Sequence, residues 1–255
     1  MIRARERVRV QVVRGGKVVA EVESEGNTLT SAFLTNFRTE VTENADYQLI
    51  KPLYAIGVRY DTALYGSATL TPADITVDDV NMMLKVTKGI TVNTTGQINC
   101  VVLWMESIAP ENEVTVVYLD SPVAVSAGDI VNVQYTGNFY MVAENLKGIL
   151  ADASLDHRNM TLRVMQRLAG LVTDSLRVAR VDYLDPNAVT VMSVNTQNDT
   201  ANYTVVAPQT TAPQTFDLKT IKFCDSQGRT LLTWLKATAL RVPAGFALSV
   251  RVQVA

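Results

Sequence analysis

The sequence predicts a mainly β protein built from two tandem antiparallel β-sandwiches of the jelly-roll type, each with one short helix. Three observations lead to this fold class. Val and Thr are frequent in short alternating runs, turn signals recur throughout the chain, and one strand–turn–strand stretch occurs twice. Short strands separated by turns about every 8–12 residues are typical of β-sandwiches, whereas parallel sheets need a long helix between consecutive strands.

The repeated stretch divides the chain. Residues 121–135 and 238–252 both read as a strand, an Ala-Gly turn and an alternating strand, and their glycines, Gly128 and Gly245, lie 117 positions apart (245 − 128 = 117). Earlier matches keep the same order, and their spacing falls along the chain from 132 to 123 to about 119, as small loop deletions in a duplicated domain would leave. We therefore expect an internal duplication, with a first repeat at residues 1–137 and a second at 138–255.

Local patterns place the individual elements. Two alternating apolar runs flank Gly15-Gly16 within residues 7–22, which predicts a tight hairpin. Helical spacing of apolar residues predicts one helix at 27–41, after cap-type residues, and another at 160–172.

Other stretches give further expectations. Residues 53–60 and 98–105 read as apolar strands, and Gly57 inside the first indicates a bulge or a close backbone approach. Residues 80–86 fit either a strand or a helical turn. Residues 203–206 read as a strand, and the stretch 197–215 around them, rich in Asn, Thr, Gln, Ala and Pro, is a candidate for a projecting loop.

Charge and hydropathy exclude several classes of partner. The chain has 23 basic and 25 acidic residues, so it lacks the broad positive field that binding to nucleic acid requires. The early arginines alternate with Ala and Val, which indicates one solvated face of a strand. We find no apolar secretory signal and no run of the roughly 18 apolar residues that cross a membrane, so we expect a chain made in the cytoplasm without a membrane span.

No residue cluster has the pattern of a catalytic or cofactor site. His157 stands in a polar connection, where Asp156 is badly placed to orient it, and we expect a surface residue. Cys100 and Cys224 lack the spacing of metal ligands and are expected to be buried free thiols. Acid pairs such as Asp78-Asp79 fall in predicted turns, so a Ca²⁺ loop or a pair of glycosidase carboxylates stays open only as an alternative. We expect no cofactor, no metal and no enzyme activity.

Several stretches resemble the small β-rich virion proteins of bacteriophages, found in tails, fibres, baseplates and accessory capsid positions. The resemblance lies in the hairpin, in Asn27-Thr28-Leu29-Thr30 at the start of a helix, in Tyr54-Ala55-Ile56-Gly57, and in the Ala-Gly-Asp turn of residues 121–135. It is fainter in the second half, where Phe246 stands in the position of Asp129.

The resemblance implies a non-enzymatic component of a virus particle that acts through self-assembly and contacts with other virion proteins. Homo-oligomers and a location in the virion are the corresponding expectations. The residues assigned to protein contacts are those of the basic first strand and of the apolar face of the second helix: Arg3, Arg5, Arg7, Arg9, Leu162, Met165 and Leu168.

A carbohydrate-binding or adhesin module for host attachment is the alternative function. Such a module would expose aromatic side chains on one sheet face or at loop tips. The candidates for contact with a host-surface glycan are Tyr60, Tyr65, Tyr140 and Tyr203.

Overall fold

The computed structural model describes residues 2–26, 28–43, 48–143, 151–185, 188–193, 195–198 and 203–254. The chain is mainly β, and its sheets are antiparallel throughout the described pairings. The elements of the first half are β1 (Ile2–Arg14), β2 (Lys17–Gly26), α1 (Ser31–Thr42), β3 (Leu53–Tyr60), β4 (Ala63–Thr69), η1 (Pro72–Asp74), β5 (Ile75–Asp78), β6 (Met83–Thr91), β7 (Gly96–Met105), η2 (Pro110–Asn112), β8 (Glu113–Val125) and β9 (Ile130–Met141).

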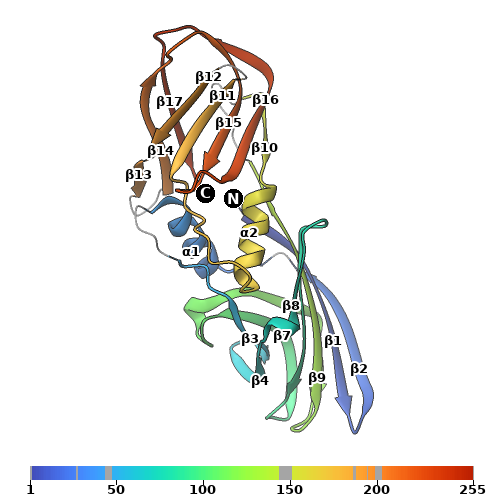
Figure 1. The fold of residues 1–255 in the computed structure, drawn as a ribbon. Coiled ribbons are helices and arrows are strands. Elements are labelled where there is room, and N and C mark those ends of the chain that lie inside the picture. Colours follow the sequence, from blue (N-terminus) through green and yellow to red (C-terminus); the bar gives the residue numbers. More distant parts are fainter. Residues whose placement is uncertain are drawn as a thin grey trace.

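The second half also contains one helix and a series of strands. Its elements are β10 (Ala153–Asp156), α2 (Arg158–Leu168), β11 (Arg180–Asp185), β12 (Ala188–Ser193), β13 (Asn195–Asn198), β14 (Tyr203–Thr211), β15 (Phe216–Cys224), β16 (Thr230–Val242) and β17 (Ala247–Gln253). The strands of the two halves lie at opposite ends of the molecule, with α1 and α2 between them (Figure 1).

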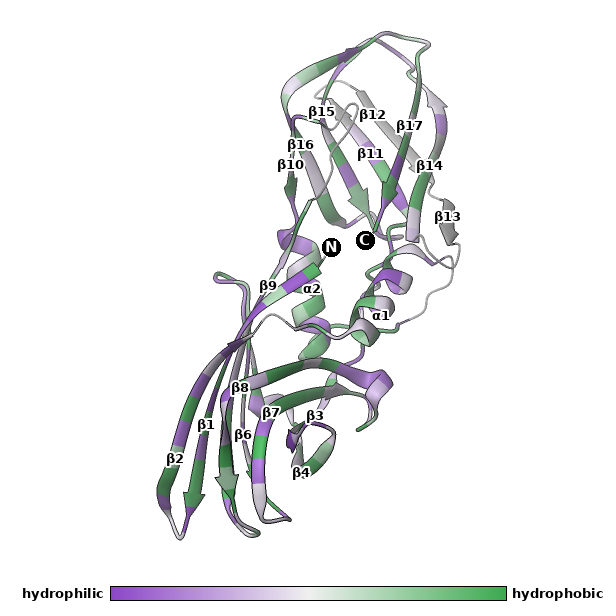
Figure 2. Ribbon diagram, turned by 180° about the vertical axis from the view of Figure 1, so that it is seen from behind, coloured by the Kyte–Doolittle hydropathy of each residue, from purple (hydrophilic) through white to green (hydrophobic). Residues whose placement is uncertain are grey.

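Two sheets form the first half. One has the strand order β2-β1-β9-β6-β5 and the other β4-β3-β7-β8. In β1 every second residue is buried and the residues between them are partly or fully exposed. Figure 2 shows the matching alternation of hydrophobic and hydrophilic residues along β1. Val8 and Val10 of the first sheet share one hydrophobic cluster with Ile56 and Leu103 of the second.

The second half has the same order in its corresponding strands. One sheet runs β10-β16-β15-β11-β12 and the other β13-β14-β17. The strand order β12-β11-β15-β16 corresponds to the order β4-β3-β7-β8, and the order β13-β14-β17 corresponds to β5-β6-β9. Among the described residues the differences are at the sheet edges: β10 pairs with β16, and the β1–β2 hairpin lies beside β9, whereas β17 ends its sheet.

The two Ala-Gly turns have matching geometry. Gly128 and Gly245 adopt φ of +89° and +83°, the left-handed region in which glycine is least strained. Gly128 donates its N–H to the carbonyl of Val92, and Gly245 donates in the same way to Ala212. Val92 and Ala212 in turn donate to the residue after each glycine, Asp129 and Phe246.

Irregularities in the ladders also recur. Each of the pairs β7–β8 and β15–β16 contains two register shifts. In β7 they fall between Ile98 and Cys100 and between Leu103 and Trp104, and in β15 between Leu218 and Thr220 and between Phe223 and Cys224. The spacing is 120 at both places (218 − 98 = 120; 223 − 103 = 120). Bulges are specific features of a strand pair and are retained within families.

The helices join the two halves. Thr30 caps α1 by accepting the N–H of Phe33, as its position in the sequence indicates. Helix α1 contacts β8 and β14, and α2 contacts β9 and β16, so each helix touches strands of both halves. Their buried residues, including Phe37 and Met165, belong to the same hydrophobic cluster as the sheets.

Most expected elements are confirmed. The Gly15-Gly16 hairpin and both helices are present, although α2 ends at Leu168 and its residues 169–172 lie beyond it. A Cβ on Gly57 would lie 2.7 Å from the ring of Trp104, so the expected close approach is confirmed. Residues 79–82 form a turn before β6.

Other expectations differ from the structure. The strand expected at residues 203–206 is confirmed within β14. The projecting loop expected over residues 197–215 is wrong, because β14 extends to Thr211 and pairs with both β13 and β17. The position between 137 and 138, where we divided the repeats, falls inside β9, which pairs with β1 as far as Met141. Residues 144–150, near the start of the expected second repeat, lie outside the described residues.

Candidate functional site

A buried ion pair links the two helices. Glu40 of α1 and Arg167 of α2 have side chains only 0% and 2% exposed, and Glu40 Oε1 lies 3.1 Å from Arg167 Nη1. Arg167 also donates to the carbonyls of Ile50 and Asp174, and Glu40 Oε2 accepts the N–H groups of Leu49 and Ile50 at 2.9 and 2.8 Å. Burial raises the pKa of Glu40, and this effect outweighs the hydrogen bonds and the charge of Arg167, which act to lower that pKa. Both buried charges are therefore compensated by each other and by backbone groups of the surrounding structure.

A second buried carboxylate, Glu6 of β1, links this strand to β9 and to the segment before α1. Tyr135 donates its hydroxyl to Glu6 Oε1 at 2.8 Å, and the N–H of Thr28 donates to Oε2 at 2.9 Å. Burial and the neighbouring Glu6 raise the pKa of Tyr135 well above its usual value. Glu6 therefore fixes β9 and the approach to α1 and has no free oxygen directed into a cleft.

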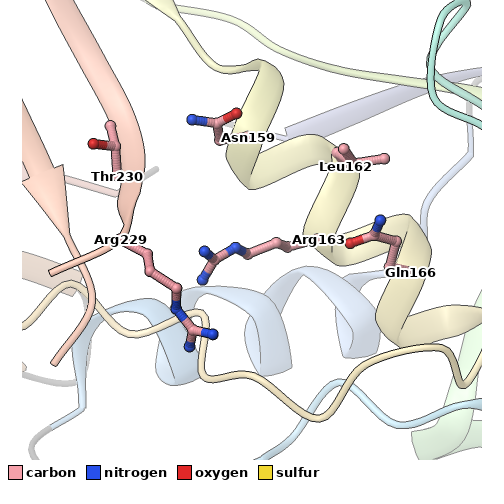
Figure 3. A pocket seen from close by; sticks show the side chains of 6 residues that line it. All are labelled: Asn159, Leu162, Arg163, Gln166, Arg229 and Thr230. Carbon is pink, nitrogen blue, oxygen red and sulfur yellow. The ribbon is translucent and has the colours of Figure 1, made fainter. Parts of the chain in front are cut away.

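One open pocket of about 340 Å³ lies between α2 and the start of β16. Figure 3 shows its lining side chains: Asn159, Leu162, Arg163, Gln166, Arg229 and Thr230. Both guanidinium groups are paired, since Arg163 and Arg229 bind Asp225 at 2.8 and 2.7 Å and Arg229 also binds Asp174 at 2.7 Å. Although burial opposes it, the two arginines lower the pKa of Asp225. The pocket thus has compensated charges, which favours a structural junction over an anion site.

The arginines predicted for protein contacts lie along β1. Arg7 binds Glu25 at 2.7 Å, and Arg9 binds Glu21 at 2.7 Å and Glu23 at 3.6 Å, all on the neighbouring strand β2. Arg5 lies over the ring of Tyr140 at 5.7 Å, and Arg3 is partly exposed. The row is therefore a ladder of mixed charge on an exposed sheet face and not an isolated basic patch.

The three residues predicted on the second helix separate into two groups. Met165 and Leu168 are fully buried in the core of the chain, so they are not available to another protein. Leu162 is partly buried and lines the pocket. The apolar face of this helix is thus used within the chain, and that part of the contact surface is wrong.

The four tyrosines predicted for glycan contact do not share one sheet. Tyr60 and Tyr65 belong to the β3–β4 hairpin, Tyr140 lies on β9, and Tyr203 begins β14. Tyr60 is 37% exposed, whereas Tyr65 is partly buried with its hydroxyl near Gly96. This arrangement does not assemble a single aromatic platform.

The remaining candidates have local structural roles. Cys100 and Cys224 are buried free thiols, as expected, and burial raises the pKa of each. His157 is partly buried, and its Nδ1 lies 3.0 Å from Thr161 Oγ1. Among the described residues, no three His, Cys, Asp or Glu side chains gather as metal ligands.

Asp129, singled out in the sequence only as part of the turn motif, locks that turn to the hairpin. Arg14 donates to both of its carboxylate oxygens at 2.9 and 2.8 Å, and the N–H of Ser126 donates to Oδ2 at 2.8 Å. These bonds lower the pKa of Asp129 to about 2. In the corresponding position Phe246 is 60% exposed.

This lowered pKa gives a pH-dependent stability. A carboxyl whose folded pKa lies below its unfolded value stabilises the fold above about pH 4 and loses that contribution as the pH falls toward 2. We expect the difference in urea midpoint between the native chain and Asp129→Asn to shrink from pH 5 to pH 2. Arg14→Gln, which leaves only the Ser126 bond, should show a smaller dependence, and an equal difference at all pH values would contradict the assignment.

Sequence reasoning missed the sheet edges. Strand β2 pairs with β1 and β17 pairs with β14, and the structure gives neither of them a second strand partner in its described residues. Val18 and Val19 of β2 are 54% and 51% exposed. The replacement of Asp129 by Phe246 was visible in the sequence, but its meaning depends on which strands lie beside it.

The comparisons with known proteins give no match: no protein-family model, no curated protein and no solved structure is similar to the chain. Among the helices described here, none is long and apolar enough to cross a membrane.

Proposed function

We propose that the chain is a non-enzymatic structural subunit of a virus particle, of the kind that the resemblance to phage virion proteins implies, and that it acts through self-assembly. The observation that carries the proposal is the position of β2 at the end of its sheet, where only β1 pairs with it among the described residues and where Val18 and Val19 are each about half exposed. The outer edge of a strand presents unpaired N–H and C=O groups, which are a template for pairing with another chain.

We also propose that the two halves are copies of one β-sandwich domain. The common strand order, the matching Ala-Gly turns and the register shifts at a constant spacing of 120 support this origin. Each feature involves different residues, and coincidence in all of them has no simple physical cause apart from a shared ancestor. A duplicated domain presents two related surfaces at fixed relative positions, which suits a repeated assembly.

The junction between the halves supports a rigid subunit. The Glu40–Arg167 pair, the contacts of both helices with both halves and the continuous hydrophobic cluster hold the two domains together. A subunit that must repeat regularly in a particle needs such fixed geometry.

Light scattering coupled to gel filtration, over a concentration series of the purified chain, tests the proposal. We expect a defined oligomer or a higher assembly whose mass is a multiple of the monomer mass. A chain that stays strictly monomeric at the highest concentration would overturn the proposal of self-assembly.

A further inference from the structure

The two halves differ at one edge. In the first half β9 has two neighbours, β6 on one side and β1 of the N-terminal hairpin on the other. The corresponding strand β17 has β14 on one side, and among the described residues it ends its sheet. The first half therefore shows what the edge of this fold accepts, namely an antiparallel strand of a β-hairpin.

The hydrogen-bonding groups on the open side of β17 can be identified. The N–H of Val254 donates to the carbonyl of Tyr203, so the even-numbered residues of β17 direct their backbone groups toward β14. Ser249 and Arg251 then direct theirs to the open side. The residues 117 positions earlier, Asn132 and Gln134, pair with Gln11 and Arg9 of β1.

The residue that follows the turn glycine, just before β9 and β17, also differs between the two halves. Asp129 binds Arg14 of the hairpin, whereas Phe246 occupies the corresponding place in the second half and is 60% exposed. A hairpin anchor in the first half is thus an exposed apolar residue in the second. That is the exchange expected where a partner covers the edge only after assembly.

A second copy of the chain offers a strand of suitable form. Strand β2 is the outer strand of the hairpin and pairs only with β1 among the described residues. Its end lies beside β8, where Ser24 accepts the N–H of Asp120. The part of β2 before Ser24 carries the exposed Val18 and Val19 and the exposed acids Glu21 and Glu23, which also contact Arg9 of β1. Arg251, exposed on β17, has the opposite charge.

We propose that β2 of one copy adds to the open edge of β17 of the next copy, and so continues the five-stranded sheet of one molecule into the three-stranded sheet of its neighbour. This inference rests on the proposed function and names its contact. The two edges are different surfaces, so the contact is head-to-tail, and each added copy leaves one β2 edge and one β17 edge open. Rings or filaments are the products, and closed twofold dimers are not.

Two blocked variants test the contact. Ser249→Pro removes one outward N–H of β17 and leaves the bonds to β14 intact, and Arg251→Pro is a second variant of the same kind. Val18→Lys combined with Val19→Lys blocks β2 by placing two charges at its edge, as natural edge strands do. Ser249→Thr keeps the N–H and is the matched control.

Light scattering and circular dichroism of the purified full-length variants give the readout. We expect each blocked variant to be a folded monomer, Ser249→Thr to assemble like the native chain, and an equimolar mixture of Ser249→Pro with the double lysine variant to form a heterodimer of twice the monomer mass and nothing larger. The heterodimer can form only from one open β17 and one open β2, so it also shows that both variants are folded.

The outcomes separate the two proposals. A native chain that assembles while Ser249→Pro and Arg251→Pro assemble equally well would overturn the β2–β17 contact and leave self-assembly standing. Blocked variants that are monomeric alone but form no heterodimer would also overturn it. A native chain that never assembles would overturn both.

Discussion

Glu40→Ala is expected to lower the free energy of unfolding by about 3–5 kcal/mol, the usual result of removing one partner from a buried ion pair. Arg167 would keep its charge at a site where its side chain is 2% exposed, with only the carbonyls of Ile50 and Asp174 as partners. The N–H groups of Leu49 and Ile50 would lose their acceptor as well. Urea unfolding followed by circular dichroism measures the change.

Two further variants make this result specific. Glu40→Leu combined with Arg167→Met should recover much of the lost stability, because an apolar pair of similar size removes the unpaired charge. Glu25→Ala, which breaks the exposed pair with Arg7, should leave the urea midpoint almost unchanged. A small effect of Glu40→Ala, or a double variant no more stable than the single one, would contradict the assigned role.

Gly66→Ala is expected to destabilise the first half by about 3 kcal/mol, near the upper end of the usual cost of overpacking. Gly66 lies on β4, and a Cβ there would come within 2.5 Å of the Thr91 carbonyl oxygen and 3.0 Å of Ile90 Cγ2 on β6. The near atom is backbone, so relief requires the two sheets to separate locally. Thermal or urea unfolding of the variant measures the cost.

Gly128→Ala provides the matched glycine control. Its Cβ would meet nothing within 4 Å, so the cost comes only from the left-handed φ of +89° and should be about 1–2 kcal/mol. If Gly66→Ala were no more harmful than Gly128→Ala, the close approach of β4 to β6 would be wrong.

Local features of the fold could be predicted from the sequence. Gly15-Gly16 specifies a tight hairpin through its backbone freedom, and both glycines adopt positive φ. The spacing of Phe33 and Phe37 specifies a helix with a buried face, and both are buried. These patterns depend on residues a few positions apart, so they are legible without the tertiary structure.

Contacts between distant residues could not be predicted in this way. Glu40 and Arg167 are separated by 127 positions, and nothing near either one indicates its partner. The burial of Met165 and Leu168 depends on how α2 packs between the halves, so an amphipathic pattern alone did not separate an internal face from an external one. The position of β17 at the end of its sheet, among the described strands, depends on the sheet order, which local sequence patterns do not show.

Amide hydrogen exchange at two protein concentrations tests the proposed contact between β2 of one copy and β17 of the next. At a concentration where the native chain assembles, we expect the amides of Ser249 and Arg251 to exchange at least about tenfold more slowly than in the dilute monomer. The reason is that these amides gain hydrogen-bond partners on β2 of the next copy. Those of Val250 and Val252, bonded to β14 in both states, should change much less. Equal exchange rates of the Ser249 and Arg251 amides in the monomer and in the assembly would rule out the β2–β17 contact.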